Sequence, residues 1–247
     1  MKLTQIQHYL QDQHLDGWLL YCFQNNNPIA LSVAGLRNGG TRRWFLWVPA
    51  QGEPEWLIHA IEGNTFAHIA PAMRGAIHQY AGWRELATQL GQMVGAQSGR
   101  RLRIAMEYSE ENAIPYISRV DAGTKEMVER VTGAEIVSSA DLTQLALAVL
   151  SPEALDDHRA AAARCLAIKD GAFGFIAAQL RAGRPLTEWD VHQFICAEFA
   201  AAGMDPEFTP IVAVNRNAAD PHYAPSAEHH SPIRIGDMVL IDLWNRI

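Results

Sequence analysis

The sequence predicts an α/β domain followed by an α+β domain. In the first half, apolar runs of strand length alternate with amphipathic runs of helix length, which is the order typical of α/β folds. In the second half, two long helical patterns come before two apolar strands. A strong helix-start signal at Ser151 separates the halves. We therefore expect one domain over residues 1–148 and another over residues 149–247, with the connection near 145–152.

Strand and helix patterns alternate along the first half. Residues 18–23 (WLLYCF) form an apolar run that the turn-forming residues 25–28 (NNNP) end. Residues 42–49 and 55–61 are rich in aromatic and β-branched side chains and are separated by AQGEP, which predicts a β-hairpin. The other expected elements are helices at 3–14 and 83–97, a buried strand at 101–108, and two short helices at 109–120 and 123–131.

The second half begins with a helix whose ends the local sequence defines. Ser151 is a good N-cap, Pro152 suits the first helical position, and Glu153 is an acid in the first turn. Gly183 and Pro185 end the pattern. The side chains expected on its apolar face are Leu166, Phe173, Ile176 and Leu180.

A second helix follows, again with a clear start. Thr187 and Asp190 form a capping box, and Gly203 ends the pattern. Two apolar strands, at 210–214 and 238–243, then flank a polar loop that holds most of the chemically active side chains. The apolar stripe expected on the helix consists of Val191, Phe194, Ile195 and Phe199.

Composition argues against several classes of partner. The net charge is −7 and the 20 basic residues are scattered, whereas nucleic acids and anionic membranes favour clustered Lys and Arg. Three cysteines without CxxC spacing suit a reducing compartment. No signal-peptide pattern is visible, and no apolar run approaches the roughly 20 residues of a membrane span. We expect a cytoplasmic protein that binds neither nucleic acid nor membrane.

Asp242 stands inside the last apolar strand. Because alternate residues of a strand share a face, Met238, Leu240 and Asp242 point the same way. Both faces of the strand are apolar, which predicts that both are covered and that the carboxylate loses its hydration. Such a group needs an arginine, several backbone donors or a metal ion. Spacing alone equally allows an aspartate at the strand end that faces solvent or caps a turn.

His222 lies in the polar loop within the sequence ADPHYAP. Prolines at both sides restrict its backbone, which suits an imidazole that must be presented to a ligand. The alternative is a surface histidine that packs beside Tyr223. His229 and His230 are read as part of a solvated loop, because adjacent residues rarely bind one ion together.

Several segments resemble one family. PHYAP (221–225) with GDMVLIDLW (236–244), and further segments at 104–124 and 210–225, resemble the proline-specific metallopeptidases of the pita-bread fold, the Xaa-Pro aminopeptidases and Xaa-Pro dipeptidases (prolidases). The first half resembles their creatinase-type N-terminal domain. The resemblance implies an α/β creatinase-like domain plus an incomplete α+β pita-bread domain, and an enzyme that hydrolyses the peptide bond before proline.

The resemblance also implies cofactors and residue roles. That family holds two divalent metal ions, often Mn, Co or Zn, with two aspartates, a histidine and two glutamates. Asp242 resembles the first of these aspartates, and His222 resembles the histidine that contacts the substrate outside the metal's coordination sphere. The implied substrates are small peptides with proline at the second position, and the implied assembly is a homodimer.

The sequence departs from the family pattern after Asp242. The second aspartate is expected about a dozen residues later, and the histidine and both glutamates after it, but the sequence stops at Ile247. We expect an N-terminal portion of a longer enzyme that binds no metal pair and is inactive alone, and whose last strand is an exposed apolar edge that favours dimers.

Two alternatives remain open. A creatinase-like hydrolase shares both domains and uses a histidine without a metal pair, although Asp242 argues against it. A non-catalytic module could use the same fold to bind peptides or proteins.

Overall fold

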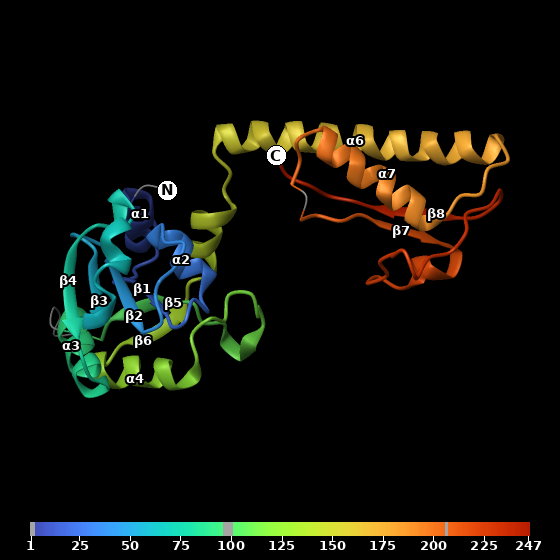
Figure 1. Cartoon of the computed structure of the whole chain (residues 1–247). Helices are drawn as coiled ribbons and strands as arrows, with labels where there is room; N and C mark the ends of the chain where they lie inside the picture. The colour runs from blue at the N-terminus through green and yellow to red at the C-terminus, as the bar shows by residue number, and fades with distance from the viewer. Residues whose placement is uncertain (1–2, 96–100, 206) are drawn as a thin grey trace. The chain divides into compact units, whose positions relative to one another are not determined.

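The computed structural model describes residues 3–95, 101–205 and 207–247. The chain divides into two compact units, unit 1 (Met1–Val149) and unit 2 (Leu150–Ile247). Unit 1 is built on a six-stranded mixed sheet of order β4-β3-β2-β1-β5-β6 (Figure 1). Its strands are β1 (Gly17–Cys22), β2 (Trp44–Pro49), β3 (Glu55–His59), β4 (Ala76–Tyr80), β5 (Arg103–Met106) and β6 (Glu135–Ser138).

Helices cover both faces of this sheet. Along β1, Trp18, Leu20 and Cys22 enter one core while Leu19 and Tyr21 enter the other, because successive side chains of a strand point to opposite faces. The first core is completed by α1, α2 and α5, and the second by α3 and α4. These helices are α1 (Leu3–Asp12), α2 (Pro28–Ala34), α3 (Trp83–Gly95), α4 (Ala122–Thr132) and α5 (Ala140–Thr143). The α/β class predicted for this half is confirmed.

The predicted hairpin is confirmed, and one predicted helix is wrong. β2 and β3 pair antiparallel, with Phe45 opposite Leu57. At 109–120 the structure has only the 3₁₀ turn η4 (Glu110–Asn112). Glu111 and Asn112 have φ of 51° and 55°, and left-handed residues cannot continue a right-handed helix. The helix expected at 83–97 is confirmed as far as Gly95, and residues 96–97 lie outside the described residues.

A buried carboxylate links the strands of unit 1 to α2. Glu107, directly after β5, is fully buried and accepts hydrogen bonds from Trp18 Nε1 (2.6 Å) and Asn27 Nδ2 (2.8 Å). Asn27 also caps α2, since its Oδ1 accepts the Ala30 N–H. Burial raises the pKa of the Glu107 carboxyl to about 7, although its hydrogen bonds to Trp18 and Asn27 act in the opposite direction.

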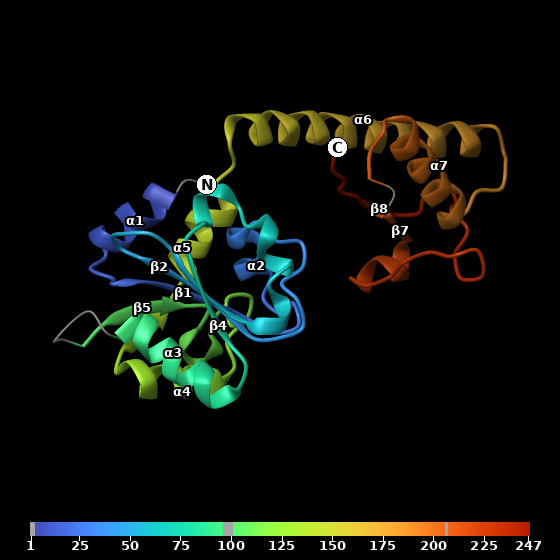
Figure 2. The same cartoon turned by 60° about the vertical axis from the view of Figure 1, so that its left-hand side comes forward.

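Unit 2 packs two helices against a two-stranded ribbon. α6 (Pro152–Arg181) and α7 (Glu188–Ala201) lie on one face of the antiparallel pair β7 (Ile211–Val214) and β8 (Val239–Asp242) (Figures 1 and 2). The predicted caps are confirmed, because Ser151 Oγ accepts the Ala154 N–H. The Thr187–Asp190 capping box is likewise present. None of the described helices is long and apolar enough to cross a bilayer.

The predicted apolar face of α6 is partly wrong. Ile176 is buried and Leu180 is partly buried, but Leu166 is 59% and Phe173 43% exposed. The stripe that packs consists of Ala161, Ile168, Ala172 and Ile176. Residues spaced by four, such as Ile168, Ala172 and Ile176, recur on one side of a helix, and this side, rather than the one that carries Leu166 and Phe173, faces α7 and the ribbon. On α7, the predicted stripe is confirmed, with Val191, Ile195 and Phe199 buried and Phe194 packed beside them.

Candidate active site

The polar loop between β7 and β8 is closed at its base by asparagine and aspartate side chains. The loop starts with the 3₁₀ turn η6 (Asn215–Ala219). Asn215 Nδ2 donates to Asp237 Oδ1 (2.8 Å), and Asn215 Oδ1 accepts the Met238 N–H (3.1 Å). The Asn215 N–H in turn donates to the Met238 carbonyl (3.0 Å). These bonds hold the two ends of the loop together where the ladder of the ribbon stops.

A buried glutamate at the start of α7 holds the middle of the loop. The Glu188 carboxylate is 0% exposed and accepts the backbone N–H groups of Val214 and Ser231, each at 2.6 Å. Asn217 Nδ2 donates to both of its oxygens, at 2.9 and 3.2 Å. The Tyr223 hydroxyl also donates to it. The Glu188 carboxylate thus joins the first residue of α7 to the end of β7 and to three points of the loop.

The surroundings of the Tyr223 hydroxyl shift its pKa. The ring is 7% exposed. Burial, and then the hydrogen bond and negative charge of Glu188, raise the pKa of Tyr223 to about 12. The hydroxyl therefore stays protonated and donates to Glu188 throughout the physiological pH range.

His222 lies next to Tyr223 on the exposed side of the loop. Its backbone N–H donates to Asp220 Oδ1 (2.9 Å), and the Tyr223 N–H donates to the Asp220 carbonyl (3.1 Å), so a tight turn presents the residue. Its side chain is exposed. The imidazole makes no hydrogen bond with any residue that the structure describes. It is thus held through its backbone while its ring remains available to a ligand.

Asp242 is more exposed than the sequence predicts. Met238, Leu240 and Asp242 share a face, as expected, but all three are exposed, so the prediction that both faces of the strand are covered is wrong for the described chain. The reason is that α6 and α7 pack only against the other face, through Val239 and Ile241. The carboxylate has no hydrogen bond or ion pair among residues 3–95, 101–205 and 207–247.

No hydrogen bond or ion pair joins His222 and Asp242 within the described residues. Asp242 pairs with Ile211 at the start of β7, whereas the loop that carries His222 leaves β7 after Val214. Three residues of strand, about 10 Å, separate these two points of β7. Asp242 is a hard oxygen donor without a partner, which suits a divalent cation. Within the described part of the chain, however, no cluster of three His, Cys, Asp or Glu side chains surrounds it or any other point.

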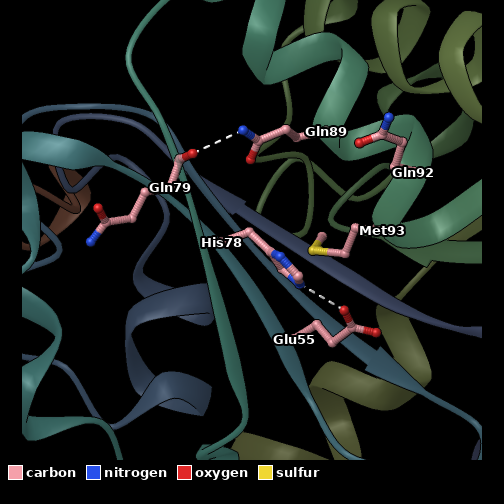
Figure 3. Close-up of a pocket in the computed structure, with 6 residues that line it drawn as sticks. All are labelled: Glu55, His78, Gln79, Gln89, Gln92 and Met93. Carbon is pink, nitrogen blue, oxygen red and sulfur yellow. Dashed lines mark hydrogen bonds and ion pairs between the residues drawn. The ribbon is translucent and has the colours of Figure 1, made fainter.

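A polar cavity in unit 1 contains none of the motif residues. It has a volume of about 400 Å³ and lies between β3, β4 and α3 (Figure 3). Within it, His78 Nε2 and Glu55 Oε2 are paired at 2.9 Å, so the two titratable groups of the cavity already satisfy each other. The residues that line it are Glu55, His78, Gln79, Gln89, Gln92 and Met93.

Sequence reasoning missed Glu188 altogether. The capping box of Thr187 and Asp190 marked the helix start, but Glu188 between them reads only as an acid in the first turn. Its partners at 214, 217, 223 and 231 are between 26 and 43 residues away in sequence. No local pattern marks such contacts, so only the folded chain reveals them.

Comparisons with known proteins agree with this arrangement. Residues 157–247 match metallopeptidase family M24. A search of curated proteins found no match. The segment that matches the family contains α7, the loop with His222 and the strand with Asp242.

Solved structures share the fold over nearly the whole chain. A dipeptidase PepE from Mycobacterium ulcerans is 19% identical, with a TM-score of 0.65, over 97% of this chain and 58% of its own. An Xaa-Pro dipeptidase from Bacillus anthracis is 17% identical, with a TM-score of 0.59, over 99% and 60%. A dipeptidase from Pyrococcus horikoshii OT3 is 20% identical, with a TM-score of 0.58, over 98% and 60%. The predicted fold is confirmed, and the chain spans about 60% of the length of these structures.

Proposed function

We propose that this chain, whose residues 157–247 match metallopeptidase family M24 and whose fold is that of the dipeptidases above, forms part of a metallopeptidase that hydrolyses the peptide bond before proline. The observation that carries the proposal is that the matched segment includes both the His222 loop and the strand that ends at Asp242. Both side chains are exposed and unengaged by the rest of the described chain, as groups that meet a substrate or an ion must be.

Asp242 is proposed as one ligand of a pair of divalent ions, with Mn, Co and Zn as candidates. When bound, such a pair supplies Lewis acidity and an activated nucleophile for attack on the peptide carbonyl. A single carboxylate is too small a donor set to hold the pair, so the proposal requires ligands from outside these 247 residues. The share of the solved dipeptidases that this chain spans supports this requirement.

His222 is proposed to stabilise charge that develops on the substrate. When the carbonyl carbon is attacked, its oxygen becomes negative, and a donor held in advance lowers the barrier most at that moment. The imidazole can donate such a bond, since its ring has no other partner within the described chain. The turn through Asp220 keeps the backbone of His222 in place while this happens.

Replacing His222 by alanine is expected to slow hydrolysis about 10²–10³-fold in kcat, with a smaller change in KM. The physical reason is that the lost bond is strongest to the charged transition state. The measurement is steady-state hydrolysis of an Xaa-Pro dipeptide by the protein that contains the remaining metal ligands. His158→Ala, an exposed histidine on α6, is the matched control and is expected to change nothing. Equal kcat in the His222 and His158 variants would contradict the proposal that His222 stabilises charge on the substrate.

The 247-residue chain alone is expected to show no hydrolysis of Xaa-Pro dipeptides and no stoichiometric binding of Mn²⁺ or Zn²⁺. One carboxylate without further ligands cannot desolvate a divalent ion. Calorimetric titration with each metal, and a peptidase assay on rigorously purified chain, are the measurements. Metal-dependent turnover by the chain alone would contradict the requirement for external ligands. A chain that binds proline peptides without any turnover, even when the remaining ligands are supplied, would instead favour a binding module.

The substrates and assembly that accompany this proposal are small peptides with proline in second position and a homodimer in the cytoplasm. Exposed apolar side chains in and beside β8, those of Leu240, Met238 and Trp244, support association, because open apolar strands pair readily. A single sedimenting species of monomer mass at high concentration would count against the dimer.

A further inference from the structure

Most of the hydrogen bonds that the Glu188 carboxylate accepts come from one loop. Four residues donate to its carboxylate, and three of them, Asn217, Tyr223 and Ser231, belong to the loop between β7 and β8. The fourth is Val214, the last residue of β7. A carboxylate that served only to cap α7 would use donors of its own helix, so the direction of these bonds calls for a different explanation.

The Glu188 carboxylate is surrounded by hydrogen-bond donors. An ionised carboxylate can only accept hydrogen bonds, and every group that faces Glu188 is a donor. Its own backbone N–H donates to the Ser231 carbonyl at 3.0 Å, and Thr187 bridges to Pro232. In the described chain no cation pairs with it. The position at the first residue of α7 also favours a negative charge, because helix N-termini are partly positive.

These bonds fix the backbone on both sides of His222. Asn217 precedes it by five residues and Tyr223 follows it directly, and both side chains end on the same buried carboxylate. Between them, Asp220 accepts the N–H groups of His222 and Tyr223. The exposed imidazole therefore stands on a short segment whose two ends are anchored to a buried, immobile point.

We propose that Glu188 is the positioning residue for His222, acting through Tyr223 and Asn217 rather than on the substrate itself. This inference rests on the proposed function, because it assigns Glu188 to the same reaction. Displacement of a catalytic group by about 1 Å costs on the order of 10²-fold in rate, so a carboxylate that holds the loop in place has a kinetic effect without touching substrate.

Glu188→Gln is the direct test, in the protein that contains the remaining metal ligands. Glutamine keeps the size of the side chain but presents an NH₂ donor to a set of donors, so the loop loses part of its anchor. The expected result is a fall in kcat of about 10–100-fold with little change in KM. Glu198→Gln, an exposed glutamate on the same helix, is the matched control and is expected to keep full activity.

A double-variant cycle separates positioning from simple stability. If Glu188 acts through His222, Glu188→Gln in a His222→Ala background costs no more than about twofold further, because the group that it positions is already gone. Full additivity of the two losses would overturn the inference. Tyr223→Phe removes one donor and leaves Glu188 in place, so it provides the same cycle should the Glu188 variant fail to fold.

A structural readout on the 247-residue chain distinguishes failure of this inference from failure of the proposed function. Hydrogen exchange at the amides of Val214 and Ser231 is expected to speed up in Glu188→Gln, while the amides of Ala213 and Leu240, which face each other across the ribbon, stay protected. Unchanged exchange at both amides would overturn the anchoring role whatever the activity. Faster exchange, together with a His222→Ala enzyme of normal kcat, would keep the anchor but refute its link to catalysis.

Discussion

Asp242→Ala is expected to lower kcat/KM for Xaa-Pro dipeptides by more than about 100-fold in the protein that carries the remaining ligands. Removing even an outer partner of a metal ligand costs about 10–100-fold, and removing a ligand itself costs at least as much. The metal content, measured by atomic emission on the same preparation, is expected to fall in parallel. Both losses together would identify Asp242 as a ligand rather than as a structural residue.

The exposure of Asp242 makes this result interpretable. Because the carboxylate has no partner among the described residues, its removal is expected to leave the unfolding free energy of the chain within about 0.5 kcal/mol of the original. Asp157→Ala, an exposed aspartate on α6, is the matched control. Activity and metal content that match those of the control would end the assignment of a metal site at this strand.

Unit 1 is expected to lose stability as pH rises from about 4.5 to 7, because of Glu107. The pKa of its carboxyl is about 7 in the folded chain against an ordinary value of 4.5, so the folded form holds a proton that the unfolded form has released. The stabilisation is complete below pH 4.5 and is lost as pH rises through about 7. The difference of about 2.5 units corresponds to about 3 kcal/mol.

Glu107→Gln is expected to remove this pH dependence. The amide does not titrate, and like the protonated carboxyl that the folded chain holds at pH 5 it offers both a donor and an acceptor, so the variant is expected to be about as stable as the original chain at pH 5. Urea unfolding followed by tryptophan fluorescence at pH 5, 6, 7 and 8 is the measurement, because five of the seven tryptophans lie in unit 1. Glu126→Gln, exposed on α4, is the control. If the unfolding free energy of the Glu107 variant falls with pH as steeply as that of the original chain, another titrating group causes the pH dependence.

Much of the local structure was predictable because its causes are local. Ser151 and Thr187 accept hydrogen bonds from backbone groups three residues away, and Gly183 and Gly203 take the left-handed conformation that ends a helix. The β2–β3 hairpin was predictable for the same reason, since its strands are neighbours in sequence. The short parallel strands β4 and β6 were not predicted, because few apolar residues mark them and their partners are distant.

Which side chains of a helix or strand are buried was harder to predict than whether a segment forms a helix or a strand. Leu166 and Phe173 match a helical repeat as well as the buried Ile168 and Ile176 do, and only packing against α7 decides which stripe is covered. Asp242 shows the same limitation. The alternation of side chains along a strand correctly predicts that Met238 and Leu240 share a face with Asp242. It does not predict whether another segment of the chain covers that face.

The sequence by itself determined most of the elements and the α/β and α+β classes, because caps, breakers and periodicity act over a few residues. It pointed to His222 and Asp242 through segments that resemble the motifs of one family. The tertiary structure alone decided that Glu107 and Glu188 are buried hubs. Their partners stand up to 89 residues away for Glu107 and 43 for Glu188. A glutamate carries no local sign of where the folded chain will place it, and the cost of burying its charge is met only by donors that folding brings together.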